Sequence, residues 1–216
     1  MLALVNEESN LLSPRDTTET ENEPNTTATE SLNVDDGKMR IDLERSNLKE
    51  RFPNSTLESN IEIYYSDRVP QEMLDETILL INSTTNSKVI SQIFLDTEYN
   101  PKLDPSDKAY SFERNVMYIV KWDDDPEYPM FNRYFYHELG HLLLGEYMHI
   151  NGLASEDEIP LKEDWVYYFC PDSFSEDFAK MYEYYKVWPG ILDTYVEFFG
   201  IGPSVAIMKE LITTFE

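Results

Sequence analysis

This chain of 216 residues has few of the residues on which several classes of protein depend. Its single cysteine, Cys170, excludes an intramolecular disulfide. Lysine and arginine number 17 against 42 acidic residues, giving a net charge of -25, and no basic patch is apparent. No apolar run approaches the length of about 20 residues that a membrane span requires. The sequence therefore predicts neither a nucleic-acid partner nor a membrane span.

The first 37 residues differ in composition from the rest. Residues 1–37 contain no aromatic residue and are dense in Glu, Asn, Thr and Ser, with nine acidic residues and one arginine. Such a segment cannot bury enough apolar surface to order itself. We therefore expect a disordered acidic arm over 1–37 and one folded domain over 38–216, of a size that suits a monomer.

The chain begins without a recognisable targeting signal. Met1–Val5 is apolar, but it is too short for a signal peptide and has no basic flank. The acidic, Thr-rich arm resembles the spacer of an exported or lipid-anchored bacterial protein. We expect an extracellular or cell-surface protein whose leader is absent from this sequence, with a cytoplasmic protein as the alternative.

Four segments of regular structure are expected between the arm and residue 120. Ile61–Tyr65 alternates like a strand, and the segment after Pro70, 71–81, has helical periodicity. Segments 89–95 and 116–120 have the composition of further strands. This order predicts an α+β domain with a small mixed sheet. The strand over 116–120 directly precedes the motif below, and we expect it to line a cleft that binds an extended peptide.

The strongest motif is HELGH, an HExxH pattern that uses two of the three histidines. On a helix His137 and His141 stand one turn apart on one face, opposite an apolar face, with Glu138 at the boundary. This arrangement is typical of a zinc site that carries its own general base. Glu146 would fall on the apolar side, so we expect the helix to end near Gly145.

A catalytic zinc site requires a third protein ligand beside the two histidines. His149 is out of register for this role, and we expect it in a loop over 148–156. A second helical stretch opening at Ser175 offers Glu176 on the same face as Ala179, a residue small enough to allow close helix approach. Asp172 is the alternative ligand in a different register.

HELGH followed by Glu176-Asp177-Phe178-Ala179 resembles the anthrax lethal factor-like zinc peptidases, which include the Pro-Pro endopeptidases. The resemblance covers about the last ninety residues. It implies a zincin-like fold with a helical C-terminal half and one catalytic Zn²⁺ held by His137, His141 and Glu176. It also implies hydrolysis of peptide bonds in a protein or peptide substrate by a zinc-activated water, with Glu138 as general base.

Two positions depart from the family pattern. The family has a glutamate four residues after the ligand, where this chain has Lys180, and Glu183 on the same predicted face is the candidate to replace it. The family also has an oxyanion-stabilising tyrosine upstream, for which Tyr168 is the first candidate and Tyr167 the second.

These departures leave two other functions open. The first is a zinc-binding interaction module without catalysis, which Lys180 and the uncertain tyrosine favour and the intact Glu138 disfavours. The second is a regulatory peptidase that cleaves one repressor and resembles the ImmA/IrrE type. A ligand role for Asp172 would favour the second.

Overall fold

The fold is taken from a computed structural model that describes residues 32–35, 38–41, 48–97, 109–113, 115–120, 130–160 and 162–216. Most of the predicted acidic arm therefore lies outside the described residues. Strands β1 (Leu32–Asp35) and β2 (Lys38–Ile41) form an antiparallel pair. This pair crosses the predicted boundary between arm and domain at residue 37.

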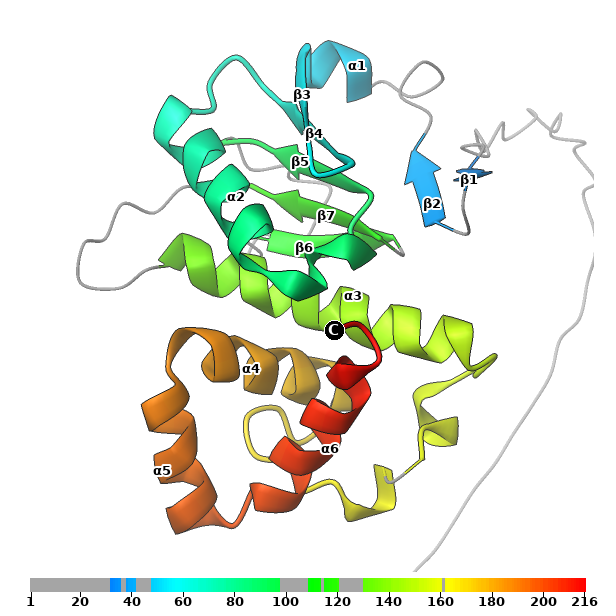
Figure 1. The fold of residues 1–216 in the computed structure, drawn as a ribbon, viewed down its shortest axis with the longest axis vertical. Coiled ribbons are helices and arrows are strands. Elements are labelled where there is room, and N and C mark those ends of the chain that lie inside the picture. The colour runs from blue at the N-terminus through cyan, green and yellow to red at the C-terminus, as the bar shows by residue number, and fades with distance from the viewer. Residues whose placement is uncertain are drawn as a thin grey trace, which may run out of the picture.

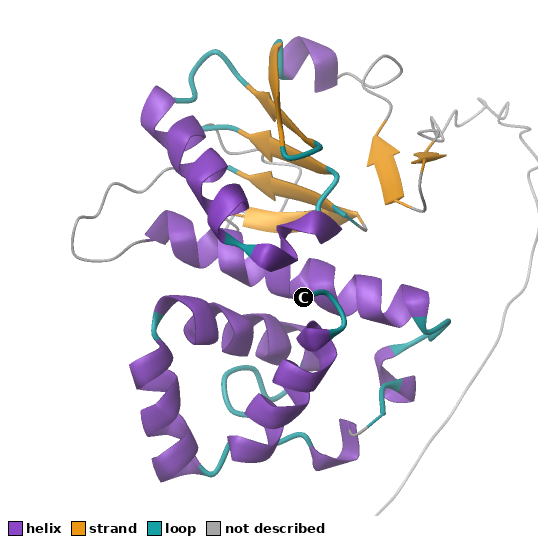
Figure 2. Ribbon diagram, viewed as in Figure 1, coloured by secondary structure: helices purple, strands orange, loops and turns teal. Residues whose placement is uncertain are grey.

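A five-stranded mixed sheet forms one half of the domain (Figure 2). Its strands are β3 (Asn54–Glu58), β4 (Ile61–Tyr65), β5 (Gln92–Leu95), β6 (Ala109–Glu113) and β7 (Val116–Ile119). Their order across the sheet is β3-β4-β5-β7-β6. Strands β4, β5 and β7 run parallel, whereas β3 and β6 pair antiparallel at the two edges.

The connections of the sheet follow from local sequence. Ser59 and Asn60 adopt φ values of 49° and 67°, which allow a tight hairpin turn between β3 and β4. Helix α2 (Gln71–Ser83) starts after Pro70 and links β4 to the parallel strand β5. The predicted strand over 61–65 and the helix after Pro70 are confirmed. The strand predicted over 89–95 begins only at Gln92, because a 3-10 helix, η1, occupies Thr85–Val89.

Strand β7 confirms the strand predicted over 116–120. It lies between β5 and β6, and β6 is the edge strand, which the sequence analysis did not predict. Asn115, with φ 71°, makes the turn that folds β6 back onto β7.

Helices form the other half of the domain. The short helix α1 (Leu48–Arg51) precedes the sheet. The long helix α3 (Met130–Ile150) lies between the sheet and three later helices (Figure 1). These are α4 (Phe174–Val187), α5 (Pro189–Phe199) and α6 (Gly202–Thr213). Two 3-10 turns, η2 (Glu156–Glu158) and η3 (Lys162–Asp164), connect α3 to α4. One apolar core includes Ile93 of the sheet, Phe135 and Leu139 of α3, and Phe178 of α4. The α+β class is confirmed.

The described helices carry no stretch both long and apolar enough to cross a membrane.

Helix α3 continues past Gly145, so its predicted end there is wrong. The carboxylate of Glu146 accepts a hydrogen bond of 3.2 Å from Asn115, which compensates for its position on the packed side of the helix. The helix ends instead at Ile150, and Gly152 just beyond it adopts φ 66°. Gly152 N–H donates to His149 O and Leu153 N–H donates to Met148 O, the two bonds of a Schellman motif.

Candidate metal centre

Helices α3 and α4 pack closely at the centre of the HExxH motif. A Cβ atom added to Gly140 would lie 2.8 Å from Cα of Ala179, nearer than side chains approach a backbone. Ala179 is fully buried, and the predicted close approach at this residue is confirmed. The contact places the N-terminal turn of α4 against the face of α3 that carries His137 and His141.

The three predicted metal ligands meet at this crossing. His137 Nε2 lies 3.4 Å from Glu176 Oε2, and His141 Nε2 lies 3.4 Å from Glu176 Oε1. One ligand atom of each residue lies within 4.8 Å of the other two. Within the described part of the chain, this is the one cluster of three or more His, Cys, Asp or Glu side chains with such geometry.

The cap of α4 explains why Glu176 faces the histidines. Ser173 is the N-cap residue, and its side chain accepts a hydrogen bond of 3.3 Å from Glu176 N–H. In a capping box the glutamate at this position reaches back to the N–H of the cap residue. Here Ser173 N–H donates to Cys170 O instead. The Glu176 carboxylate is therefore free to turn toward α3.

Each histidine also has a partner on its second ring nitrogen. His141 Nδ1 forms a hydrogen bond of 2.8 Å with Ser175 Oγ. His137 Nδ1 lies 3.6 Å from Glu183 Oε2, the carboxylate that the sequence offered in place of a glutamate at position 180. Such partners fix the orientation of metal-binding imidazoles and leave Nε2 toward the ion.

Ionisation of these groups in the metal-free protein follows from their contacts. Burial alone would lower the pKa of His137, but the carboxylates of Glu176 and Glu183 outweigh it and raise that pKa to about 9. The contacts with His137 and His141 hold the pKa of Glu176 far below its usual range. The cluster is therefore a network of imidazoles and carboxylates. A metal cation would compete with protons for the ring nitrogens that face Glu176.

The donor set suits zinc. Two imidazole nitrogens and a carboxylate leave the fourth position that a catalytic site reserves for water. The two imidazole Nε2 atoms each lie 3.4 Å from a different oxygen of the Glu176 carboxylate. The three residues thus have the donor types of a zinc site, and their ligand atoms lie within 4.8 Å of one another.

Glu138 follows the first histidine on α3 and is only 4% exposed. Its charge acts on His137, which places the carboxylate near the cluster. Burial beside the two histidines is compatible with the predicted role of Glu138 as general base, and that role stays a prediction.

The two alternative ligands lie outside the cluster. His149 is exposed in the last turn of α3, so its expected place in a loop over 148–156 is wrong. Asp172 is exposed in the turn before α4. Neither side chain belongs to the group formed by His137, His141 and Glu176.

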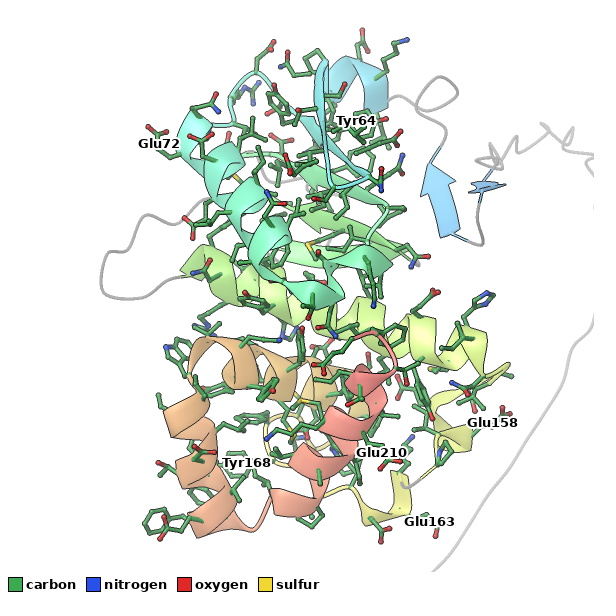
Figure 3. All side chains as sticks on the ribbon, in the orientation of Figure 1. Tyr64, Glu72, Glu158, Glu163, Tyr168 and Glu210 are labelled. Carbon is green, nitrogen blue, oxygen red and sulfur yellow. The ribbon has the colours of Figure 1, made fainter. Side chains whose placement is uncertain are left out.

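The predicted oxyanion residue, Tyr168, lies in the helical half beside α5 (Figure 3). Its ring centroid is 4.8 Å from that of Phe199 and 5.2 Å from that of Tyr195. Tyr167, the second candidate, packs its ring 6.4 Å from Phe174 and is 37% exposed. The structure thus gives both tyrosines packing contacts, and the oxyanion role stays a prediction.

Asp177 is a structural residue of the site that sequence reasoning left without a role. It is fully buried beside Glu176, and its Oδ2 accepts a hydrogen bond of 2.9 Å from Trp165 Nε1. Its Oδ1 accepts backbone N–H groups of Tyr168, Phe169 and Cys170 at 3.1, 2.5 and 2.7 Å. One carboxylate therefore fixes the loop that leads into α4.

Arg133 and Ser175 were also missed. A signal for both was present, since Arg133 lies four residues before His137 on the same helix and Ser175 directly precedes Glu176. Helical spacing alone places Arg133 on the face of His137. Its partner on α4 depends on the tertiary packing of two helices.

No protein-family model, no curated protein and no solved structure matches this chain. The likeness to the lethal factor-like peptidases therefore rests on the two motifs and on the site that they form.

Proposed function

We propose that this protein is a zinc-dependent metalloendopeptidase with a zincin-like fold. One observation carries the proposal. The HExxH histidines and a glutamate from a separate helix converge so that one ligand atom of each lies within 4.8 Å of the others, and each imidazole has a partner on its Nδ1 side. Helix packing alone does not require both features together.

In this proposal His137, His141 and Glu176 hold the ion. A bound zinc ion lowers the pKa of a water molecule and polarises a carbonyl oxygen. Glu138 accepts the proton of the attacking water and returns it to the departing amine. Ser175 and Glu183 keep the two imidazoles in the orientation that directs Nε2 to the ion.

The sheet offers a place for an extended substrate. Strand β6 lies at the edge of the sheet and is the strand nearest α3 (Figure 1). The outer backbone groups of an edge strand can pair with an added peptide strand. We therefore assign peptide binding to β6, in place of the strand over 116–120 that the sequence suggested.

The geometry favours this function over its alternatives. Asp172 is exposed and lies outside the cluster, which disfavours the ligand register of an ImmA/IrrE-type peptidase. A zinc-binding module without catalysis does not need a buried carboxylate at position 138. The arrangement of Glu138 beside the ligands therefore supports hydrolysis.

Cleavage profiling of a peptide library by the zinc-loaded protein tests the proposal. We expect cleavage at a restricted set of peptide bonds, reversible loss of activity on chelation and recovery on addition of zinc. Glu138→Gln is the matched control, because it keeps the shape of the side chain and removes the base. It should retain stoichiometric zinc while turnover falls by about 100-fold or more. If both proteins bind stoichiometric zinc and neither cleaves a peptide, the proposed peptidase activity is contradicted. The zinc-binding interaction module would then be the remaining function.

A further inference from the structure

Glu183 lies at the centre of a charged network behind His137. It is 2% exposed and belongs to α4, two turns after Glu176. Arg133 Nε donates a hydrogen bond of 2.6 Å to its Oε1, and Lys180 Nζ donates one of 2.8 Å to its Oε2. The same Oε2 faces His137 Nδ1 at 3.6 Å. A single buried carboxylate thus joins two cations to a metal ligand.

Both cations are themselves held in place. The guanidinium of Arg133 lies 5.0 Å from the ring centre of Trp188, and the ammonium of Lys180 lies 5.8 Å from that of Tyr184. These cation–π contacts orient each side chain toward Glu183. A buried carboxylate without such partners would carry a large desolvation cost.

The charges of the network matter to a metal beyond His137. With Glu183 in place, one negative charge separates two positive charges from the imidazole. Without it, both cations would face the imidazole and the ion across a few ångströms in a partly buried setting, where repulsion is stronger than in water. Glu183 would therefore have two effects on metal binding: it places a carboxylate oxygen 3.6 Å from His137 Nδ1, and it neutralises its neighbours.

We propose that Glu183 is the positioning residue of His137, and that Lys180 acts as its counter-charge. This inference rests on the proposed zinc site and extends it. It explains how the site accommodates a lysine one turn after Glu176 on α4. Lys180 does not replace a carboxylate beside the imidazole. It donates a hydrogen bond to the Glu183 carboxylate, which lies beside the imidazole.

The other histidine provides an internal comparison. His141 Nδ1 has a neutral partner, Ser175, with no cation in the contact. Loss of Ser175 removes a hydrogen bond without exposing a charge. The two ring nitrogens should therefore respond differently to removal of their partners.

Zinc affinity of the full chain, measured by competition with a chromophoric chelator, tests the proposal. The variants are Glu183→Gln, Lys180→Met, the double variant and Ser175→Ala. Glu183→Gln should weaken zinc binding by about 10- to 100-fold, the range seen for partners of metal ligands. Lys180→Met alone should weaken zinc binding, but by less than Glu183→Gln does, because Arg133 still holds the carboxylate.

The sign of the Lys180 effect is the decisive result. In the Glu183→Gln background, Lys180→Met should strengthen zinc binding several-fold, since only its repulsion of the ion remains. In the Ser175→Ala background it should weaken zinc binding as it does in the parent. The visible absorption spectrum of the cobalt-substituted protein should shift in Glu183→Gln and return toward the parent in the double variant.

Two outcomes would overturn the inference. Unchanged zinc affinity in Glu183→Gln would show that the carboxylate only stabilises packing. A Lys180→Met effect of the same size and sign in both backgrounds would show that the lysine acts independently. If Glu183→Gln does not fold, Glu183→Asp serves in its place, with weaker zinc binding expected and no recovery from Lys180→Met. Failure of the parent protein to bind zinc would instead contradict the proposed function.

Discussion

Two neighbouring carboxylates on α4 show how one helix serves both stability and chemistry. Asp177 is fully buried and accepts four hydrogen bonds from the loop that leads into α4. Glu176 has a side chain that is 51% exposed and faces two imidazole nitrogens. The first carboxylate has its acceptor sites saturated by the protein, whereas the second has acceptor capacity left for an ion.

This difference arises although both residues are acidic, adjacent and in the first turn of the helix. Successive residues on a helix point about 100° apart, so one side chain turns into the protein and the other toward α3. Protein donors occupy the acceptor sites of the Asp177 carboxylate, so it is not available to a metal. The Glu176 carboxylate has acceptor sites left and can bind one.

Asp177→Ala should have the largest effect of any change in this pair. It leaves the indole N–H of Trp165 and three loop N–H groups without their acceptor. Each buried donor left unsatisfied costs about 1–3 kcal/mol, so we expect a loss of at least about 3 kcal/mol in the free energy of unfolding. Urea denaturation of the metal-free protein measures it.

Asp172→Ala is the matched control for that experiment. Asp172 is an exposed aspartate just before the same helix, and its removal should change stability by no more than about 0.5 kcal/mol. Equal stability of the two variants would show that Asp177 does not stabilise the fold. The contrast between Asp177 and Glu176 would then fail.

Glu176→Ala should have the opposite profile. Zinc content after dialysis should fall to background, because two histidines alone leave the ion under-coordinated. The stability of the metal-free protein should fall by less than in Asp177→Ala, since the Glu176 side chain is half exposed. Elemental analysis and denaturation of the same samples separate the two effects.

His149→Ala and Asp172→Ala are controls for metal content and should stay loaded. An empty site in Asp172→Ala with a loaded site in Glu176→Ala would reverse the assignment of the third ligand. It would favour the ImmA/IrrE-type register.

The grouping of His137, His141 and Glu176 could be predicted from the sequence because it depends on two local patterns. HELGH places two histidines one helical turn apart, and the face of the second helix that carries Glu176 also carries Ala179. The choice of Glu176 as third ligand and the part given to Glu183 came in addition from the resemblance to the lethal factor-like peptidases.

What the sequence did not reveal depends on contacts between distant segments. Glu146 argued for an early end to α3, yet it pairs with Asn115 from the turn between β6 and β7. The roles of Arg133 and Ser175 depend on the register of α3 against α4. Strand β6 was missed, so the strand over 116–120 was the one expected to line the cleft, although β6 lies outside it at the edge of the sheet.

The pH dependence of stability in the metal-free protein tests the contact between Glu176 and the histidines, and its expected effect is smaller. The pKa of His137 rises from 6.5 to about 9 on folding, so its contribution to stability is complete below pH 6.5 and is lost as pH rises through 9. The pKa of Glu176 is lowered from 4.5, so its contribution is complete above pH 4.5 and is lost as pH falls further. The contact between His137 and Glu176 contributes to both shifts, with Glu183 adding to the first and His141 to the second.

We therefore expect the cluster to stabilise the metal-free protein most between about pH 4.5 and 6.5. Thermal denaturation across pH 4 to 10, compared with Glu176→Ala, isolates this contribution. The parent should lose more stability than the variant between pH 6.5 and 9. Saturating zinc should remove that difference in pH response, because the ion takes the place of the proton. Parallel profiles without zinc would contradict the ionic contact.

Tyr168→Phe carries the smallest expected effect and tests the loop that Asp177 fixes. The backbone N–H of Tyr168 donates to Asp177, whereas its ring packs on α5 beside Phe199. An oxyanion role requires the ring to turn toward the metal when substrate binds. If it does so, Tyr168→Phe should lower kcat more moderately than Glu138→Gln and leave KM little changed. The same kinetic change in Tyr167→Phe would move the role by one residue. Unchanged kcat in both would assign the two rings to packing and leave oxyanion stabilisation to the metal.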